Sequence, residues 1–239
     1  MIIIHDGRLP VEYIRALEIK VPDAEFESLD VVYSGVYESV SCHPDIYIFQ
    51  LDGNTLIHAP GVPKDLLKKL KDSGVNLIAG EDDPGVEYPK TARYNALSIG
   101  GFLFHNLEYT DPVILEEAEK RGLKLVNVPQ GYTRCSCLPA GKNAIITQDA
   151  KIAEIADTHG LDTLLVSSEN ITLPGEERGF IGGCGARTSD GNVILLGDVN
   201  MHPDGKRIEG FLKEHSSGLI MTENMPIYDA GSLLLLETS

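Results

Sequence analysis

A weak pattern recurs five times along the chain and constrains the fold more than any other feature of the sequence. Each copy starts with an aromatic residue, has a small or thiol-bearing residue four positions later, and continues toward an apolar, strand-forming run; the clearest copy is Gly131 to Thr147. The five pairs are Tyr37 with Ser41, Tyr94 with Ser98, Tyr132 with Ser136, Phe180 with Cys184, and Tyr228 with Ser232. Five copies of one pattern predict an internal repeat.

The same order of elements follows each of the first four copies: two strands, a helix and a third strand. In the first copy a hairpin turn at Asp52-Gly53-Asn54 precedes a strand over Thr55 to His58, a helix over Pro63 to Asp72, and a strand over Val75 to Ala79. Later helices are predicted to start near Pro112, Asp149 and Pro203. The chain therefore reads as repeated ββαβ units.

The fifth unit is divided between the two ends of the sequence. Tyr228 to Glu237 supplies its first strand only, and the missing strand, helix and strand match residues 2–7, Leu9 to Ile19, and Glu25 to Val32. A unit shared between the termini closes a circular array. We expect one domain over residues 1–239, an α/β propeller of five ββαβ blades with pseudo-fivefold symmetry; an open α/β sheet is the alternative.

Five ββαβ units around a central channel resemble the pentein fold of the guanidino-group modifying enzymes. That superfamily includes arginine and agmatine deiminases, dimethylarginine dimethylaminohydrolase and amidinotransferases, and also the non-catalytic translation initiation factor six. The resemblance implies carboxylates that bind a guanidinium group, a histidine that acts as general acid and base, and a cysteine that attacks the guanidinium carbon. The family's carboxylate in the first unit matches Asp45.

Both catalytic positions of the family depart from its pattern in this chain. Where the family has its histidine, residues 131–134 read GYTR, and where it has its nucleophilic cysteine, residues 229–232 read DAGS. Arg134 would also oppose a guanidinium group by charge repulsion. The resemblance therefore implies the fold without the usual catalytic cysteine and histidine.

Another set of side chains is a candidate for catalysis: Cys184, Cys42 and His43. If the first strand of each unit lines the channel, these residues converge there with Cys137 and Ser232. Cys42 or Cys184 would then be a nucleophile with His43 as its base, in a cysteine-dependent C–N hydrolase or an amidinotransferase-like enzyme acting on amidine or amide substrates. The alternative is that small residues simply pack around a crowded axis.

Polar residues near the starts of the units predict a small polar ligand in the channel. The expected ligand-binding residues are Asp45, Glu38, Asn95, Arg134, Asp229 and Ser232. Their mixed charges suit an amino acid or a guanidino compound, bound without standard guanidine-modifying activity. A scaffold role similar to that of initiation factor six is a further alternative.

The composition excludes several other classes of partner. With 36 acidic and 20 basic side chains, the net charge of −16 opposes binding to nucleic acid or to an anionic membrane. The apolar runs are too short to span a bilayer and the first five residues too short for a signal peptide, so a cytoplasmic location is expected. Cys135 and Cys137 lack the spacing of zinc knuckles and would face the same side of a strand. No metal or cofactor is expected.

Overall fold

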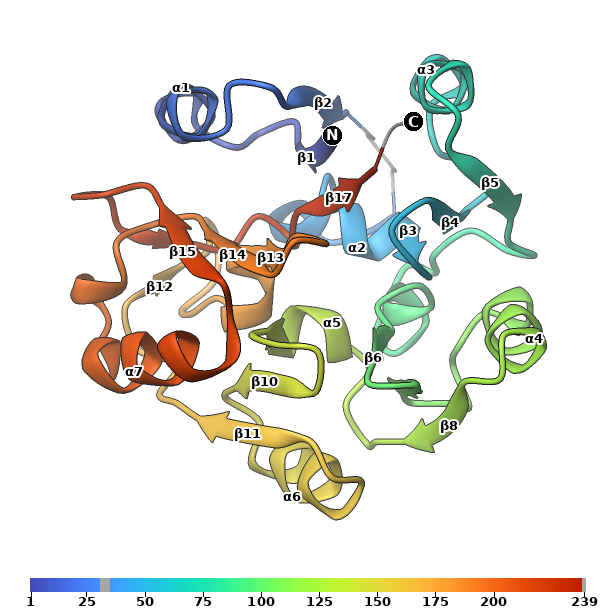
Figure 1. Cartoon of the computed structure of the whole chain (residues 1–239). Helices are drawn as coiled ribbons and strands as arrows, with labels where there is room; N and C mark the ends of the chain where they lie inside the picture. The colour runs from blue at the N-terminus through green and yellow to red at the C-terminus, as the bar shows by residue number, and fades with distance from the viewer. Residues whose placement is uncertain (31–34, 238–239) are drawn as a thin grey trace.

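Five three-stranded sheets repeat one connection along the chain. In each sheet the middle strand pairs antiparallel with one neighbour and parallel with the other, and a helix joins the two parallel strands. The computed structural model describes residues 1–30 and 35–237. Figure 1 shows the five joining helices at the periphery and the strands nearer the centre. The architecture is a mixed α/β fold in which the first, antiparallel strand of each sheet lies on the side toward the centre of the molecule.

The elements of each sheet follow one another in the chain, apart from those of the terminal sheet. The terminal sheet has β17 (Leu234–Leu236), β1 (Ile2–Asp6), α1 (Val11–Lys20) and β2 (Glu25–Leu29). The next two have β3 (Ile48–Gln50), β4 (Thr55–His58), α3 (Lys64–Asp72) and β5 (Asn76–Ala79), then β6 (Leu97–Ile99), β7 (Phe102–His105), α4 (Pro112–Lys120) and β8 (Lys124–Asn127). The last two have β9 (Cys137–Pro139), β10 (Ala144–Thr147), α6 (Ala150–Thr158) and β11 (Asp162–Leu165), then β13 (Gly185–Arg187), β14 (Asn192–Leu195), α7 (Gly205–His215) and β15 (Gly218–Met221).

Shorter elements connect these units. A two-stranded sheet pairs β12 (Ile171–Thr172) with β16 (Ile227–Tyr228), and two four-residue helices are α2 (Pro44–Tyr47) and α5 (Thr133–Ser136). Four 3₁₀ turns are η1 (Glu38–Val40), η2 (Lys90–Ala92), η3 (Ile181–Cys184) and η4 (Val199–Met201). Within the described residues, no helix combines the length and the apolar character needed to cross a bilayer.

The terminal sheet joins the two ends of the chain. Ile2, Ile3 and Ile4 of β1 pair antiparallel with Leu236, Leu235 and Leu234 of β17, and β1 pairs parallel with β2. β17 thus supplies hydrogen-bond partners for one edge of β1, which would otherwise present unpaired backbone groups. The strand predicted over Glu25 to Val32 is observed as far as Leu29, and its last two residues lie outside the described part of the chain.

Helical turns precede several of the inner strands, where the sequence predicts strand directly after the aromatic residue. Pro44 occupies the first turn of α2, a position at which proline's missing N–H costs nothing, and α5 contains Cys135. Cys137 begins β9 instead. The prediction that Cys135 and Cys137 face the same side is therefore wrong: the Cys135 thiol reaches Asp45, and the Cys137 thiol reaches Thr147.

Strand register places Ser136, Cys184 and Ser232 at equivalent positions. In these three sheets the third residue of the middle strand pairs with Leu138, Ala186 and Leu234 respectively. Ser136, Cys184 and Ser232 each lie two residues before that paired residue. The same count in the first two full units gives Tyr47 and Asn95. Ser41 and Ser98 therefore lie elsewhere, and the sequence pattern aligned those two units out of register.

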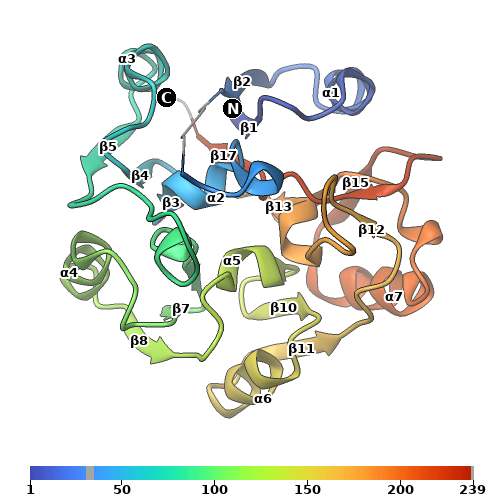
Figure 2. The same cartoon turned by 180° about the vertical axis from the view of Figure 1, so that it is seen from behind.

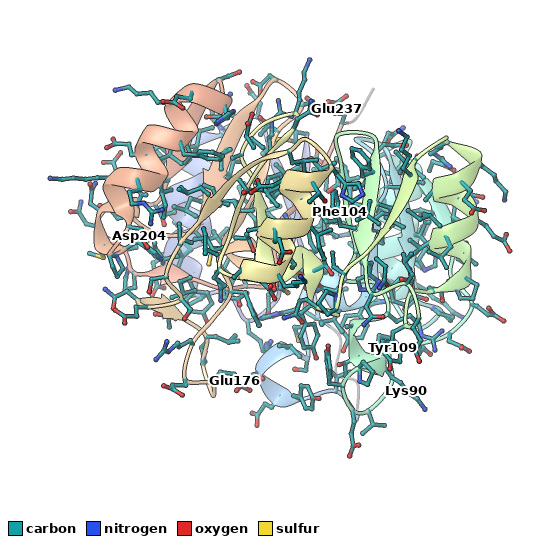
Figure 3. The ribbon with its side chains drawn as sticks, turned by 90° about the horizontal axis from the view of Figure 1, so that it is seen from below. Lys90, Phe104, Tyr109, Glu176, Asp204 and Glu237 are labelled. Atoms are coloured by element: carbon teal, nitrogen blue, oxygen red, sulfur yellow. The ribbon has the colours of Figure 1, made fainter. Side chains whose placement is uncertain are left out.

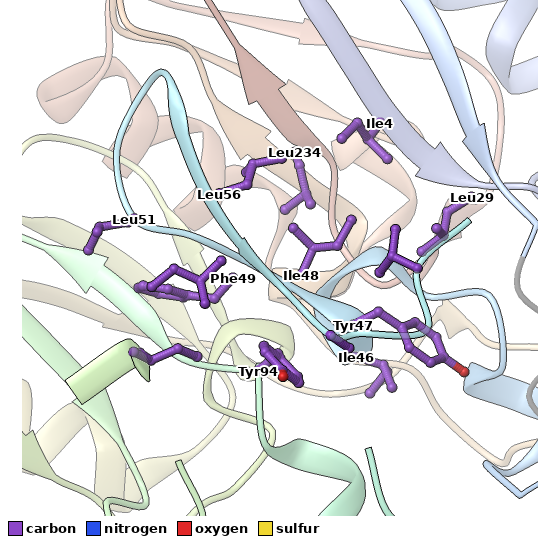
Figure 4. Packing of buried hydrophobic residues seen from close by; sticks show 14 of the residues in the cluster. Ile4, Leu29, Ile46, Tyr47, Ile48, Phe49, Leu51, Leu56, Tyr94 and Leu234 are labelled. Atoms are coloured by element: carbon purple, nitrogen blue, oxygen red, sulfur yellow. The ribbon is translucent and has the colours of Figure 1, made fainter. Parts of the chain in front are cut away.

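The largest buried cluster packs the terminal strands against the first unit. Ile4, Leu29 and Leu234 lie among residues of α2, β3 and β4, as Figure 4 shows. Tyr47 and Phe49 in this cluster are almost fully buried. Burying a leucine or isoleucine contributes about 1.5–3 kcal/mol, so this cluster reinforces the backbone pairing of β17 with β1.

Leu234→Ala should lower the free energy of unfolding by about 2–5 kcal/mol, because it leaves a cavity between β17 and the first unit. Urea denaturation monitored by circular dichroism measures the change. Ile19→Ala is the control, since that side chain is 79% exposed and its truncation removes little buried surface. Equal losses for the two variants would contradict the packing described.

A buried histidine makes the stability of the fold depend on pH. Burial lowers the pKa of His105 from 6.5 to about 4, although its Nε2 contacts the Gly131 carbonyl oxygen at 2.7 Å. The unfolded chain therefore takes up a proton between pH 6.5 and 4 that the folded chain does not. Stability is fully present above pH 6.5 and is lost as the pH falls toward 4.

Between pH 7 and pH 5, His105 should remove about 2 kcal/mol from the free energy of unfolding. Urea denaturation at the two pH values measures this loss in the wild type and in His105→Gln. The variant is less stable at pH 7 but should lose less on acidification. A variant with the full wild-type pH dependence would show that another group is responsible.

Candidate functional site

A cavity of about 550 Å³ opens at one end of the molecule. It is lined by Asp6, Arg8, Tyr37, Glu38, Ser39, His43, Leu173, Pro174, Gly175, Glu176, Tyr228 and Asp229. Four of these side chains are carboxylates and one is a guanidinium group. Glu38 and Glu176 lie exposed at the rim, whereas Asp6, His43 and Asp229 are buried at its inner side.

Arg8 and Asp6 form an ion pair inside this cavity. Arg8 Nη2 lies 2.7 Å from Asp6 Oδ2, and Arg8 Nε lies 3.1 Å from Asp6 Oδ1. The Arg8 guanidinium group also donates to the carbonyl oxygens of Glu38 and Ser39. Because Asp6 balances the only guanidinium charge in the lining, the remaining carboxylates give the cavity an excess of negative charge.

Asp229 projects into the cavity from the segment that follows β16. Its two oxygens accept hydrogen bonds from the backbone N–H groups of Phe180 at 2.7 Å and Gly231 at 3.0 Å. Burial raises the pKa of this carboxyl group. Only a glycine fits at Gly183, since a Cβ there would lie 1.8 Å from Asp229 Oδ1. The carboxylate is thus held in one orientation.

A buried polar cluster lies beyond His43 and is centred on Asp45. Asp45 Oδ2 accepts hydrogen bonds from Ser232 Oγ at 2.6 Å and from the Cys135 thiol at 2.9 Å. Asn95 donates from Nδ2 to Cys135 Sγ at 3.1 Å and accepts at Oδ1 from the Cys135 N–H at 3.0 Å. These side chains are nearly or completely buried. Seen from behind in Figure 2, α2 and α5, which contribute Asp45 and Cys135, lie near the centre.

The backbone at Ser232 is constrained to hold this cluster. Its φ of 71° lies in the left-handed region, which residues other than glycine and asparagine seldom adopt. Such a conformation costs about 1–3 kcal/mol and persists where the surroundings impose it. Ser232 Oγ lies 2.6 Å from Asp45 Oδ2 and 3.2 Å from the carbonyl oxygen of Gly182.

Arg134 does not point at the first cavity. Its side chain is half-buried, and the guanidinium group donates to the carbonyl oxygens of Cys137, Gly182 and Gly185 at 2.8–3.1 Å. Burial lowers its pKa. Arg134 lines a second cavity of about 450 Å³ together with Glu237. Figure 3 shows Glu237 and Glu176, which line the two cavities, at opposite ends of the molecule.

The candidate cysteines are all buried. The Cys184 thiol is buried and donates to the Phe180 carbonyl oxygen at 3.1 Å, and burial raises its pKa well above the ordinary value. Cys137 contacts Thr147 Oγ1 at 3.7 Å. Cys42 is also buried and precedes His43 in the loop before α2. Cys135, which was not among the candidates, is the cysteine whose thiol joins Ser232 at Asp45. The convergence of Cys42, Cys137, Cys184 and Ser232 stays a prediction.

The residues expected from the sequence fall into three groups. Glu38, His43 and Asp229 line the first cavity, Asp45, Asn95 and Ser232 form the buried cluster, and Arg134 lines the second cavity. Sequence reasoning missed Asp6, Arg8, Glu176, Tyr228 and Cys135 as parts of these sites. One sequence signal could have found Asp6. It is the last residue of a buried strand, and that position places a side chain at the edge of a sheet.

Several solved structures have a similar fold. SxtG, an amidinotransferase of the saxitoxin pathway from Microseira wollei, matches with a TM-score of 0.55 and 11% identity, over 99% of this chain and 94% of its own. Dimethylarginine dimethylaminohydrolase from Pseudomonas aeruginosa, complexed with citrulline, matches with a TM-score of 0.56 and 12% identity, over 92% of both chains. Agmatine deiminase from C. jejuni matches with a TM-score of 0.54 and 10% identity, over 93% of this chain and 86% of its own.

These structural likenesses show a shared fold, at identities too low to carry activity across. None of the curated proteins matches the chain. One family model matches residues 13–234, which is nearly the whole sequence. The chain belongs to that family, DUF6873, a family of unknown function.

Proposed function

We propose that this protein binds a small cationic or zwitterionic molecule, carrying a guanidino or amino group, in the cavity between Asp6 and Asp229. The observation that carries the proposal is the charge of the lining, four carboxylates against one guanidinium group. Ligand cavities are commonly about 300–1,000 Å³, and this one is about 550 Å³. An amino acid or a guanidino compound fits that space.

The distribution of charge within the cavity suits a ligand with two ends. Asp229 is buried and positioned by two backbone N–H groups, so it is a fixed acceptor for a planar guanidinium or an ammonium group. Water is largely excluded there, which strengthens the attraction between opposite charges. Arg8 lies in the same lining and, although it is paired with Asp6, keeps one N–H on Nη1 that could donate to a ligand carboxylate.

The fold supports the same class of ligand. The names of the similar structures refer to amidinotransferase, deiminase and dimethylaminohydrolase enzymes, one of them bound to citrulline. We infer that the five sheets form a pentein-like propeller whose last blade is completed by β1, α1 and β2. The pairing of β17 with β1 supports this inference.

Binding, without the standard guanidine-modifying reaction, is the function that these residues favour. Residues 131–134 and 229–232, where the resemblance implies a histidine and a nucleophilic cysteine, contain neither. The burial of Cys184 opposes formation of its thiolate. Cys42, next to His43 at the cavity, is the residue that keeps a cysteine-dependent hydrolase or transferase as the second candidate. A scaffold role, like that of initiation factor six, would leave the carboxylate-lined cavity without a use.

Calorimetric titration with arginine, agmatine and citrulline should detect at least one ligand, and Asp229→Asn should weaken its binding at least about tenfold. The variant removes a buried charge-assisted hydrogen bond, worth about 1.5–3 kcal/mol. The protein should first be treated with a chelator, so that no protein-bound metal ion contributes to the heat that is measured. Absence of binding to all three ligands at millimolar concentration would contradict the proposal.

Glu176→Gln should weaken the same ligand by about two- to fivefold, because its exposed carboxylate is screened by water. The matched control is Glu177→Gln, since Glu177 is adjacent in sequence, lies outside the lining and has a side chain that is 88% exposed. That variant should bind as the wild type does. Equal weakening by both substitutions would point to a general effect of net charge.

Cys184 should resist iodoacetamide at neutral pH until the protein unfolds, because its thiol is buried and hydrogen-bonded. Peptide mapping by mass spectrometry follows the modification of each cysteine. Rapid modification of Cys42, abolished in His43→Gln, would favour the hydrolase or transferase alternative. Rapid modification of Cys184 would show that its burial is not maintained in solution.

A further inference from the structure

Three buried side chains with different metal-binding atoms meet behind the cavity. One ring nitrogen of His43, one carboxylate oxygen of Asp45 and the Sγ of Cys135 all lie within 4.8 Å of one another. The three residues are each at most 3% exposed. Asp45 and Cys135 are separated by 90 positions, so the grouping is produced by the fold.

Two atoms of this group lack the hydrogen bonds that buried polar atoms normally make. Within the described residues, His43 Nδ1 and Asp45 Oδ1 are both buried without a partner. Leaving such an atom unsatisfied costs about 1–3 kcal/mol. A bound cation would satisfy both, because a neutral imidazole nitrogen and a carboxylate oxygen each offer a lone pair.

The surrounding residues are arranged as the supports of metal ligands usually are. Asp6 Oδ2 lies 3.7 Å from His43 Nε2, which places a carboxylate on the opposite side of the ring from Nδ1. Asn95 contacts Cys135 Sγ, and Ser232 contacts Asp45 Oδ2. In metal sites a carboxylate hydrogen-bonded to the far ring nitrogen fixes the histidine tautomer, and hydrogen bonds orient the other ligands. At 3.7 Å the Asp6 carboxylate is in ion-pair range of His43 and would have to move closer to make that hydrogen bond.

We propose that His43, Asp45 and Cys135 bind one divalent transition-metal ion of the Zn²⁺ type. Nitrogen, oxygen and thiolate sulfur together suit Zn²⁺ and Co²⁺ better than Mg²⁺ or Ca²⁺, which prefer oxygen ligands alone. Binding replaces the thiol proton of Cys135 with the metal and releases that proton to solvent. The thiolate and the Asp45 carboxylate then balance the two charges of the ion.

Three protein ligands leave one tetrahedral position for water or for a molecule in the cavity. Tetrahedral zinc, with bonds of about 2.0–2.3 Å, holds its ligand atoms about 3.3–3.8 Å apart. The ligand atoms lie within 4.8 Å of one another, so zinc binding requires side-chain shifts of up to about 1–1.5 Å, and the 2.9 Å contact between Cys135 Sγ and Asp45 Oδ2 would lengthen. His43 lines the cavity and gives the ion a route of entry. Arg134 interacts electrostatically with Asp45 and Cys135, but its guanidinium N–H groups donate to carbonyl oxygens of β9, η3 and β13 and so do not occupy the ligand atoms.

The test uses the full chain, dialysed against a chelator and titrated with Co²⁺ in the absence of any organic ligand. A near-ultraviolet charge-transfer band at one Co²⁺ per chain, displaced by Zn²⁺, is expected from a thiolate ligand. Cys135→Ser should abolish the band, and His43→Gln or Asp45→Asn should weaken Co²⁺ binding at least about tenfold. Cys137→Ser is the matched control, because this nearby buried thiol bonds to Thr147 instead, and it should keep the band.

Circular dichroism identifies any variant that fails to fold, and proton release by the wild type then provides the second measurement. A pH indicator in weakly buffered solution should register one proton released per Zn²⁺ bound. No charge-transfer band in the wild type, a band that persists in Cys135→Ser, or an equal loss in Cys137→Ser would each overturn the proposal. Because the metal titration needs no organic ligand, its failure is distinct from failure of the cavity to bind one.

Discussion

The antiparallel pairing of β17 with β1 is the contact on which the rest of the structure depends. It completes the terminal sheet and brings Asp229 and Ser232 from the end of the chain beside Asp6 and His43 from its beginning. The buried cluster of Ile4, Leu29 and Leu234 reinforces that pairing. Neither the lining of the cavity nor the hydrogen bond from Ser232 to Asp45 exists without it.

Charge is handled differently at the two ends of the molecule. At one end the carboxylates exceed the guanidinium groups, and Arg8 is paired with Asp6. At the other end Arg134 is half-buried, and its guanidinium group donates to backbone carbonyl oxygens, so it needs no ligand to satisfy it. The first end therefore has an excess of negative charge that a bound cation would neutralise. Arg134 instead joins α5 to its neighbours by hydrogen bonds.

Much of the fold could be predicted from the sequence because the joining helices and their parallel strands have clear periodicity. The inner ends could not, since a four-residue turn such as α2 or α5 has no period to detect. The sequence pattern also put Ser41 and Ser98 at the wrong repeat positions. The register of each inner strand is set by its pairing with the next strand, and this pairing puts Tyr47 and Asn95 at the repeat positions instead.

The candidate site was predictable only in part. Asp45, His43 and Asp229 follow from the resemblance and from their places at the starts of units, and the structure does bring them to one region. The contact of Cys135 with Asp45 depends on a side-chain direction that changes when one strand residue becomes part of a helical turn. No spacing in the sequence reports that direction.

The divided terminal sheet also has a consequence for biosynthesis. Residues 229–236 leave the ribosome after every other part of the site, so a growing chain can build its first helices and sheets but cannot assemble the cavity. Until then the open edge of β1 is available to other strands. Capacity to bind a ligand therefore appears only after residues 229–236 have been synthesised and β17 has paired with β1.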